Sequence, residues 1–325
     1  MRVGILGSGV MAEVHAAGWR TTGAELMGCA SANLEQAVRL AQQFNIKVYQ
    51  NYAELLRDVD IIDICVPTHL HKQMVLQAAT AGRHVVCEKP IALSVQDGLE
   101  MIEACDRAGV RFFVAMVVRF FPQYRLSREL VARGQIGKLG VMRLKRVSYT
   151  PQKPGDNWYL DESRSGGMVV DLMIHDFDYA RWLGGEVERV FARLNKATDG
   201  PGQYAQAILR FRDGPMALIE GGWAYPPGVF RTALDLSGTE GLIEWSSDEH
   251  APVRSFLLQR PGEAASVGLP ISGLSDDPYA LELQHAYRCI QTGEPFEVTA
   301  QDGLEALRIA LAVKESIATG KPVTL

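Results

Sequence analysis

The sequence contains a helical segment in which acidic side chains flank a histidine. Asp171, His175 and Asp178 follow a helical pattern that runs on to Trp182, so at about 100° per residue all three share one face. A carboxylate one turn from a histidine can orient the imidazole and raise its pKa, which makes an acid–base group near neutral pH. The alternatives are a surface stripe with a helix-stabilising Asp–His pair and a metal site. We expect no metal, because no other ligand cluster accompanies these residues.

A second segment, Glu88-Lys89-Pro90, follows an apolar strand pattern at residues 84–87. Ligands of open α/β sheets bind beyond the carboxyl ends of the strands, which is where this lysine is expected. A residue before proline is held out of α-helical geometry, and the Lys89–Pro90 bond can be cis. Either feature fixes the direction of the lysine side chain. The alternative is an ordinary solvated lysine in a turn.

The sequence GSGVMA at residues 7–12 fits the pattern G-x-G-x-x-A of dinucleotide-binding loops. It follows a strand pattern at residues 2–6 and opens a helical pattern, which is the context that the motif requires. Gly7 allows the tight turn, Gly9 lets the backbone approach a pyrophosphate at the helix N-terminus, and Ala12 keeps that helix close to the sheet. The context disfavours the alternative of a glycine turn in an unrelated α/β protein, and we expect dinucleotide binding.

The end of the second strand pattern bears on which dinucleotide is bound. Sites for NAD usually carry Asp or Glu there to bind the ribose 2′-hydroxyl, but residues 29–33 (CASAN) contain no acid. Ser31 can serve either a hydroxyl or a 2′-phosphate, and no arginine stands at the turn to favour NADP. The choice between NAD and NADP stays open.

The elements that must position these segments change in type near residue 120. Before it, short apolar strand patterns alternate with helices, and the run IIDICV at residues 61–66 is typical of a parallel strand covered on both faces. Such alternation is of the α/β class and predicts an N-terminal Rossmann doubly wound parallel sheet. The expected strands are 2–6, 25–30, 47–49, 61–66, 84–87 and 111–118, and the expected helices are 10–21, 34–44 with Asn33 as N-cap, 52–57, 70–81 and 95–108.

After Pro122 the pattern becomes that of an α+β domain. Period-2 alternation and turn pairs such as Asp213-Gly214 predict a large, mostly antiparallel sheet. Segments 151–167 and 261–278, rich in Gly, Pro, Ser and Asp, are expected to be long loops. The expected domains are 1–120 and 121–325. The strands expected in the second are 140–149, 187–196, 203–211, 215–225, 231–237 and 241–246, and its helices are 123–133, 277–292 and 300–319.

Composition excludes several classes of protein. Hydrophobic residues make up 47% of the 325 residues and charged residues 22%, the balance of an ordinary globular chain with room for two domains. The net charge of −5 gives no basic excess of the kind that indicates nucleic-acid binding. The apolar run at 112–118 is far short of the about 20 residues that span a membrane. We expect no signal peptide at the N-terminus, because Glu13 and His15 interrupt its apolar stretch. Five cysteines without C-x-x-C spacing predict a reducing, cytoplasmic location.

Taken together, these segments resemble the Gfo/Idh/MocA oxidoreductases over essentially the whole chain. The order and spacing of the motifs make the resemblance specific, although each motif is weak alone. It rests on the GSGVMA loop, Val66-Pro67-Thr68 with His71, Glu88-Lys89-Pro90, Arg119-Phe120 near Pro122, Gly166-Gly167 before the Asp171, His175 and Asp178 segment, and Ala312, Ser316 and Thr319-Gly320 near the end.

The resemblance implies hydride transfer between NAD or NADP and a secondary alcohol or ketone. Lys89, Asp171 and His175 are then the catalytic residues: Lys89 or His175 takes the hydroxyl proton, and Asp171 orients whichever acts. The implied cofactor contacts are Gly7, Ser8, Gly9, Val10, Met11, Ser31, Pro67, Thr68, His71, Glu88, Lys89 and Pro90. The substrate contacts that we expect are Lys89, Arg119, Trp158, His175 and Asp178.

The segment from Gly166 to Gly185 is most similar to inositol dehydrogenase-like members of that family, but Val117-Val118 stand where those often place a polar residue before Arg119. We therefore expect a sugar, a cyclitol or a related polyol as substrate. By resemblance, the open face of the second sheet packs against another subunit in a homodimer or homotetramer. The alternatives are an NAD-dependent glycosidase of the same fold, a cofactor-binding regulatory protein, and an imine or tetrapyrrole reductase.

Overall fold

A computed structural model of the chain describes residues 1–153, 155–248 and 277–325. The described residues form two compact units. The first contains residues 1–120, helix α10 (Pro278–Thr292) and the start of helix α11 (Ala300–Thr319) up to Leu304. The second contains the described residues between 121 and 248 and the chain from Glu305 to Leu325. The division into domains 1–120 and 121–325 stays a prediction. In the structure, α10 packs with the first unit.

The first unit is built on a six-stranded parallel sheet in the order β3-β2-β1-β4-β5-β6, as expected for a doubly wound Rossmann domain. All four residues of β4 are buried, which agrees with a strand covered on both faces. The strands are β1 (Arg2–Leu6), β2 (Glu25–Ala30), β3 (Lys47–Val48), β4 (Ile61–Ile64), β5 (His84–Glu88) and β6 (Phe112–Ala115).

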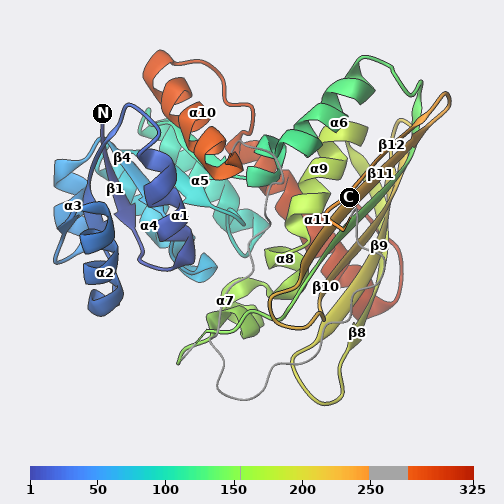
Figure 1. Ribbon diagram of the computed structural model, residues 1–325, viewed down its shortest axis with the longest axis horizontal. Coiled ribbons are helices and arrows are strands. Elements are labelled where there is room, and N and C mark those ends of the chain that lie inside the picture. Colours follow the sequence, from blue (N-terminus) through green and yellow to red (C-terminus); the bar gives the residue numbers. More distant parts are fainter. Residues whose placement is uncertain (154, 249–276) are drawn as a thin grey trace. The chain divides into compact units, whose positions relative to one another are not determined.

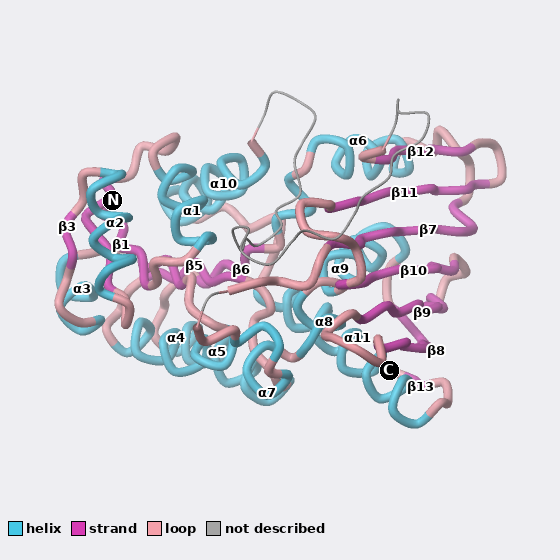
Figure 2. Tube along the Cα trace, turned by 60° about the horizontal axis from the view of Figure 1, so that its bottom comes forward, coloured by secondary structure: helices cyan, strands magenta, loops and turns pink. Residues whose placement is uncertain are grey.

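Helices cover both faces of this sheet. Figure 2 shows α1 and α10 on one face and α4 and α5 on the other. Asn33 is the N-cap of α2, as predicted, and its side chain accepts the backbone N–H of Gln36. The strand expected at 111–118 ends earlier, because Val117–Phe120 form a 3₁₀ turn, η2. The helices are α1 (Val10–Trp19), α2 (Leu34–Phe44), α3 (Tyr52–Asp58), α4 (His71–Thr80) and α5 (Val95–Arg107).

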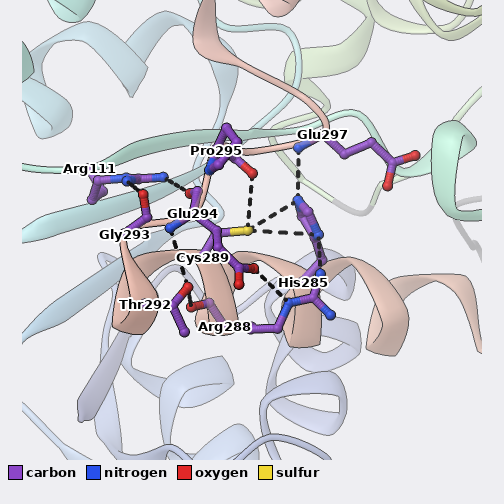
Figure 3. A network of polar contacts seen from close by, with 9 residues as sticks. All are labelled: Arg111, His285, Arg288, Cys289, Thr292, Gly293, Glu294, Pro295 and Glu297. Carbon is purple, nitrogen blue, oxygen red and sulfur yellow. Dashed lines mark hydrogen bonds and ion pairs between the residues drawn. The ribbon is translucent and has the colours of Figure 1, made fainter.

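A polar network fastens the connection between α10 and α11 to the edge of the parallel sheet (Figure 3). Arg111, which precedes β6, donates to the carbonyl oxygens of Gly293, at 3.0 Å, and Glu294. The Nε2 atom of His285 on α10 accepts the backbone N–H of Glu297 at 2.9 Å. The Arg111 contacts hold the loop after α10 at the sheet edge, and α10 itself packs against α1, where the ring of Tyr287 meets that of Trp19 edge-on at 6.3 Å between centroids.

The second unit is built on a seven-stranded sheet in the order β12-β11-β7-β10-β9-β8-β13. All neighbouring strands are antiparallel except β7 and β10, which confirms the expected α+β unit with a mostly antiparallel sheet. The two-residue strand β13 was not expected. The strands are β7 (Leu139–Ser148), β8 (Val187–Lys196), β9 (Gln203–Phe211), β10 (Met216–Trp223), β11 (Phe230–Gly238), β12 (Leu242–Ser246) and β13 (Val323–Thr324).

One face of this sheet carries the helices of the second unit (Figure 1). These are α6 (Pro122–Ala132), α8 (Gly167–Asp171), α9 (Ile174–Gly184) and the later part of α11. The loop expected at 151–167 contains the 3₁₀ turn η3 (Trp158–Leu160) and the short helix α7 (Glu162–Ser165). The other expected loop, 261–278, lies outside the described residues except at its end, where α10 begins.

Candidate active site

The two glycines of the GSGVMA loop are glycine for different reasons. Gly7 has a φ of +127°, and a Cβ on it would lie 2.3 Å from the carbonyl oxygen of Cys65, so the fold itself requires glycine there. Gly9 has an ordinary φ of −83°, and a Cβ on it would meet nothing within 4 Å. Packing therefore does not explain Gly9. The open space in front of the α1 N-terminus fits the close approach of a pyrophosphate, so the residues present fit a dinucleotide.

The ribose end of the loop carries hydroxyls instead of a carboxylate. The Ser8 hydroxyl donates to Ser31 Oγ at 2.7 Å, and Ser31 Oγ also accepts the backbone N–H of Asn33 at 3.1 Å. Ser31 directly follows β2, at the position where an acid is usual for NAD. This arrangement offers hydrogen bonds to a 2′-hydroxyl without repelling a 2′-phosphate.

His71 ties the loop after β4 to the lysine turn. Its ring is buried, with Nδ1 2.9 Å from the Pro90 carbonyl oxygen and Nε2 3.0 Å from the Val66 carbonyl oxygen. Burial lowers the pKa of this imidazole. Pro67 and Thr68 follow Val66 directly, at the start of the 3₁₀ turn η1 (Thr68–Leu70) that leads to His71. A structural role for His71 is thus clear, and the cofactor contacts of these three residues stay predictions.

The lysine turn stands where the sequence places it, at the carboxyl end of β5. The Lys89–Pro90 peptide bond is cis, as the sequence allowed. Glu88, the last residue of β5, is buried, and its Oε2 accepts the backbone N–H of Lys89 at 3.0 Å. Lys89 itself is half-buried. The carboxylate of Glu88 is therefore part of the turn that presents the lysine.

The segment that carries Asp171, His175 and Asp178 forms two helices, α8 and α9, and not the single helix that the sequence predicted. Asp171 ends α8 and His175 lies in the first turn of α9, because the N–H of Met173 reaches back five residues to the Met168 carbonyl oxygen at 3.3 Å. Asp171, His175 and Asp178 are all buried. Joint action of Asp171 and His175 stays a prediction.

A buried ion pair that was not expected from the sequence fixes α9 on the sheet. Arg146 Nε donates to Asp176 Oδ2 at 2.7 Å and its NH2 group donates to Oδ1 at 3.2 Å, and both side chains are at most 1% exposed. Arg146 also donates to the Tyr124 hydroxyl at 3.3 Å. The signal was present, since Arg146 continues the buried row of Met142 and Leu144 at period 2. This pair holds the helix that carries His175 and Asp178.

Arg119 and Trp158, which the sequence predicts to contact substrate, make contacts within their own units. Arg119 is buried in the first unit, where it donates to the Glu297 carbonyl oxygen at 3.1 Å and lies 3.4 Å from Asp302 Oδ1. Trp158 is buried in the second unit and stacks on Tyr159, with ring centroids 4.0 Å apart. These contacts give both residues a structural role, and their contact with substrate stays a prediction.

Comparisons with known proteins decide the family. Residues 1–116 match the model of the oxidoreductase family, NAD-binding Rossmann fold, and residues 128–325 match that of the oxidoreductase family, C-terminal alpha/beta domain. The chain belongs to the Gfo/Idh/MocA oxidoreductase family. The resemblance expected from the sequence is thereby confirmed. In this oxidoreductase the GSGVMA loop belongs to an NAD-binding Rossmann domain.

Several known proteins are similar to this chain over its full length. Myo-inositol 2-dehydrogenase of Thermotoga maritima is 31% identical over 100% of this chain and 98% of its own length. The scyllo-inositol 2-dehydrogenase (NAD(+)) of Bacillus subtilis is 28% identical over 100% and 96%. The crystal structure of a probable dehydrogenase from Thermotoga maritima superposes with a TM-score of 0.84 at 28% identity, covering 100% and 98%. In the described part of the chain, no helix has the length and apolar character needed to cross a membrane.

Proposed function

We propose that this oxidoreductase transfers hydride between NAD or NADP and a secondary alcohol or ketone of a sugar, a cyclitol or a related polyol. The observation that carries the proposal is the lysine turn, Glu88-Lys89-Pro90, at the carboxyl end of β5 in the same sheet whose first loop leaves space at Gly9. The inositol dehydrogenases among its relatives support the substrate class. Its five cysteines are free thiols, which supports a cytoplasmic location.

The proposed roles follow from the chemistry of the side chains. Bound NAD or NADP supplies the hydride acceptor. Lys89 Nζ or a ring nitrogen of His175 accepts the proton of the substrate hydroxyl, and Asp171 orients the acting base. Arg119, Trp158 and Asp178 are proposed substrate contacts, with hydroxyls on the charged groups and a sugar CH face on the indole.

A substrate panel tests the proposal. Purified protein is incubated with NAD and with NADP, each against cyclitols, free sugars and glycosides, while reduced cofactor and free sugar are measured. We expect reduced cofactor to form with a cyclitol or sugar, and the two cofactor arms decide between NAD and NADP. Sugar released from glycosides without net reduction identifies the glycosidase instead. Tight cofactor binding without any turnover identifies a regulatory protein.

Gly9→Ala is expected to weaken cofactor binding by about 10- to 100-fold without lowering thermal stability. The added methyl group meets no protein atom within 4 Å and suits the backbone, but it fills the space in front of α1 where the phosphates approach. Titration with reduced cofactor, together with a melting curve, measures both effects. Gly7→Ala is the matched control and should lose stability, because its Cβ collides with Cys65. Unchanged affinity in Gly9→Ala would place the cofactor elsewhere.

We propose that the sheet face opposite the helices packs against a second copy of this chain, in a homodimer or homotetramer. A groove of about 690 Å³ lies on that face over strands β7 to β12. Phe191, Ile208 and Leu218 stand directly opposite one another in it, and Ile208 is 41% exposed. Such an apolar row on a free surface is typical of an interaction site.

Ile208→Glu is expected to shift the protein toward monomer. The new carboxylate would be desolvated in the proposed interface without a partner, which costs several kcal/mol (order of magnitude). Light scattering after size-exclusion chromatography gives the mass of wild type and variant. Leu126→Glu, at a 55% exposed position on α6, is the control and should leave the mass unchanged. A wild-type monomer, or an Ile208→Glu variant of wild-type mass, contradicts this interface.

A further inference from the structure

A buried cluster of titratable side chains lies in the first unit, and of its members only Glu88 has a role in the function proposed above. His15 comes from α1, Asp63 from β4, Glu88 from the end of β5 and Glu282 from α10. His15, Asp63 and Glu282 are fully buried, and Glu88 is 7% exposed. Charged residues are rarely buried to this extent unless they are paired, so the cluster calls for an explanation.

The His15 ring is held between two carboxylates. Its Nδ1 lies 2.8 Å from Asp63 Oδ2, and Asp63 Oδ2 also accepts the indole N–H of Trp19 at 2.6 Å. Its Nε2 lies 3.0 Å from Glu88 Oε1, in an ion-pair contact. The other oxygen of Glu88 accepts the backbone N–H of Lys89. A chain of polar contacts thus runs from β4 through helix α1 to the lysine turn.

The charges in the cluster can be assigned. Burial opposes a charge on His15, but the adjacent Asp63 and Cys65 outweigh it and hold the pKa of the imidazole well above its usual value. Burial likewise opposes a charge on Glu88, but His15 and the Lys89 ammonium outweigh it and lower the pKa of this carboxyl. For Glu282, burial dominates and raises the pKa well above its usual value. These shifts favour a cationic His15, an anionic Glu88 and a neutral Glu282.

We propose that His15 is a positioning residue for Lys89. Clamped between Asp63 and Glu88, its ring ties the helix that follows the cofactor loop to the turn that presents the lysine, and its positive charge balances Glu88 beside the lysine ammonium. Four titratable groups face His15. They are Asp63 in β4, Cys65 directly after β4, Glu88 at the end of β5 and Glu282 on α10. This inference rests on the proposed function and on Lys89, of its two candidate bases, being the one that accepts the proton.

The signs of the two charges predict opposite effects on the pH profile. In the oxidative direction kcat rises with pH as the base loses its proton. In His15→Gln the positive charge next to Glu88 is lost, so Glu88 stabilises the protonated lysine more strongly. The pH at which kcat reaches half its maximum is therefore expected to be about 0.5–1 unit higher than in wild type. Removing the negative charge in Glu88→Gln lowers that pH by a similar amount, about 0.5–1 unit. General structural damage has no reason to produce opposite shifts.

The experiment is the pH profile of kcat, at saturating cofactor and the best substrate of the panel, for wild type and these two variants. Glu282→Gln is the matched control, because replacing an acid that is already neutral by its amide keeps shape and charge. Binding of reduced cofactor is measured alongside to show that each variant is folded. Opposite shifts for His15→Gln and Glu88→Gln with none for Glu282→Gln support the inference.

Unshifted profiles in His15→Gln and Glu88→Gln, shifts of the same sign, or an equal shift in Glu282→Gln would overturn the inference. If His15→Gln does not fold, Glu88→Gln decides alone, and a missing downward shift overturns it. Lys89→Met separates this inference from the proposed function. Turnover at the wild-type rate in Lys89→Met refutes the role of the lysine. A Lys89→Met variant with strongly reduced turnover, together with unshifted profiles in the other two variants, refutes only the positioning by His15.

Discussion

Lys89→Met is expected to lower kcat by about 10²- to 10⁴-fold while reduced cofactor still binds. Methionine keeps the length of the side chain but has no amine to accept the hydroxyl proton, and general acid–base catalysis contributes a factor of this size. The Glu88 contact that shapes the turn uses the backbone N–H of Lys89, which the substitution leaves in place. Steady-state kinetics with the best substrate of the panel measures the loss.

Lys72→Met is the matched control for this experiment. Lys72 lies on α4 in the same unit and pairs with Asp97 and Glu100 at 2.6 Å, and its side chain is 33% exposed. Losing a partly exposed pair of this kind changes stability by at most about 1 kcal/mol and leaves kcat unchanged. Full turnover in Lys89→Met with intact cofactor binding would move the base to His175.

Arg146→Met is expected to destabilise the protein by about 3–5 kcal/mol, because it leaves a fully buried Asp176 carboxylate without its cation. Burial already raises the pKa of Asp176 against the opposing effect of Arg146, which shows how strongly this site disfavours a lone charge. Urea unfolding of wild type and variant measures the loss. Combining Arg146→Met with Asp176→Leu should restore much of it, since an apolar pair can replace a buried ion pair.

Arg143→Met is the control on the same strand. Arg143 donates to Asp235 at 3.0 Å, but its side chain is 52% exposed, so its loss should cost no more than about 1 kcal/mol. Equal losses in the two arginine variants would mean that the buried pair contributes no more than a surface pair, and that α9 is held on the sheet by its apolar contacts.

The fold was largely predictable because its elements are periodic and their motifs are local. The parallel sheet followed from short apolar strands between helices, and the antiparallel sheet from period-2 patterns such as Ala205, Ala207 and Leu209, all of which are buried. The single helix expected through Asp171 and His175 was wrong at Leu172 and Met173, where one extra residue enters the turn. No residue type at those two positions signals such an interruption.

Contacts between distant parts of the chain could not be predicted in the same way. His15 and Glu88 are 73 positions apart (88 − 15), and only the parallel sheet brings α1 and the end of β5 together. Arg146 and Asp176 meet for a similar reason, since a strand alternation shows which face is buried but not what lies over it. The attachment of the loop after α10 to the sheet edge uses the backbone carbonyls of Gly293 and Glu294, which carry no sequence signal.

Transfer of deuterium from substrate to cofactor tests the proposed hydride transfer most directly. The best cyclitol or sugar of the panel is deuterated at the carbon that is oxidised, and the reduced cofactor is isolated and examined by proton NMR. We predict one deuterium at C4 of the nicotinamide, on a single face of the ring, in a product that the wild-type protein forms about 10²- to 10⁴-fold faster than Lys89→Met. Reduced cofactor that carries only solvent hydrogen, or no reduced cofactor with any cyclitol or sugar, would contradict the proposed function.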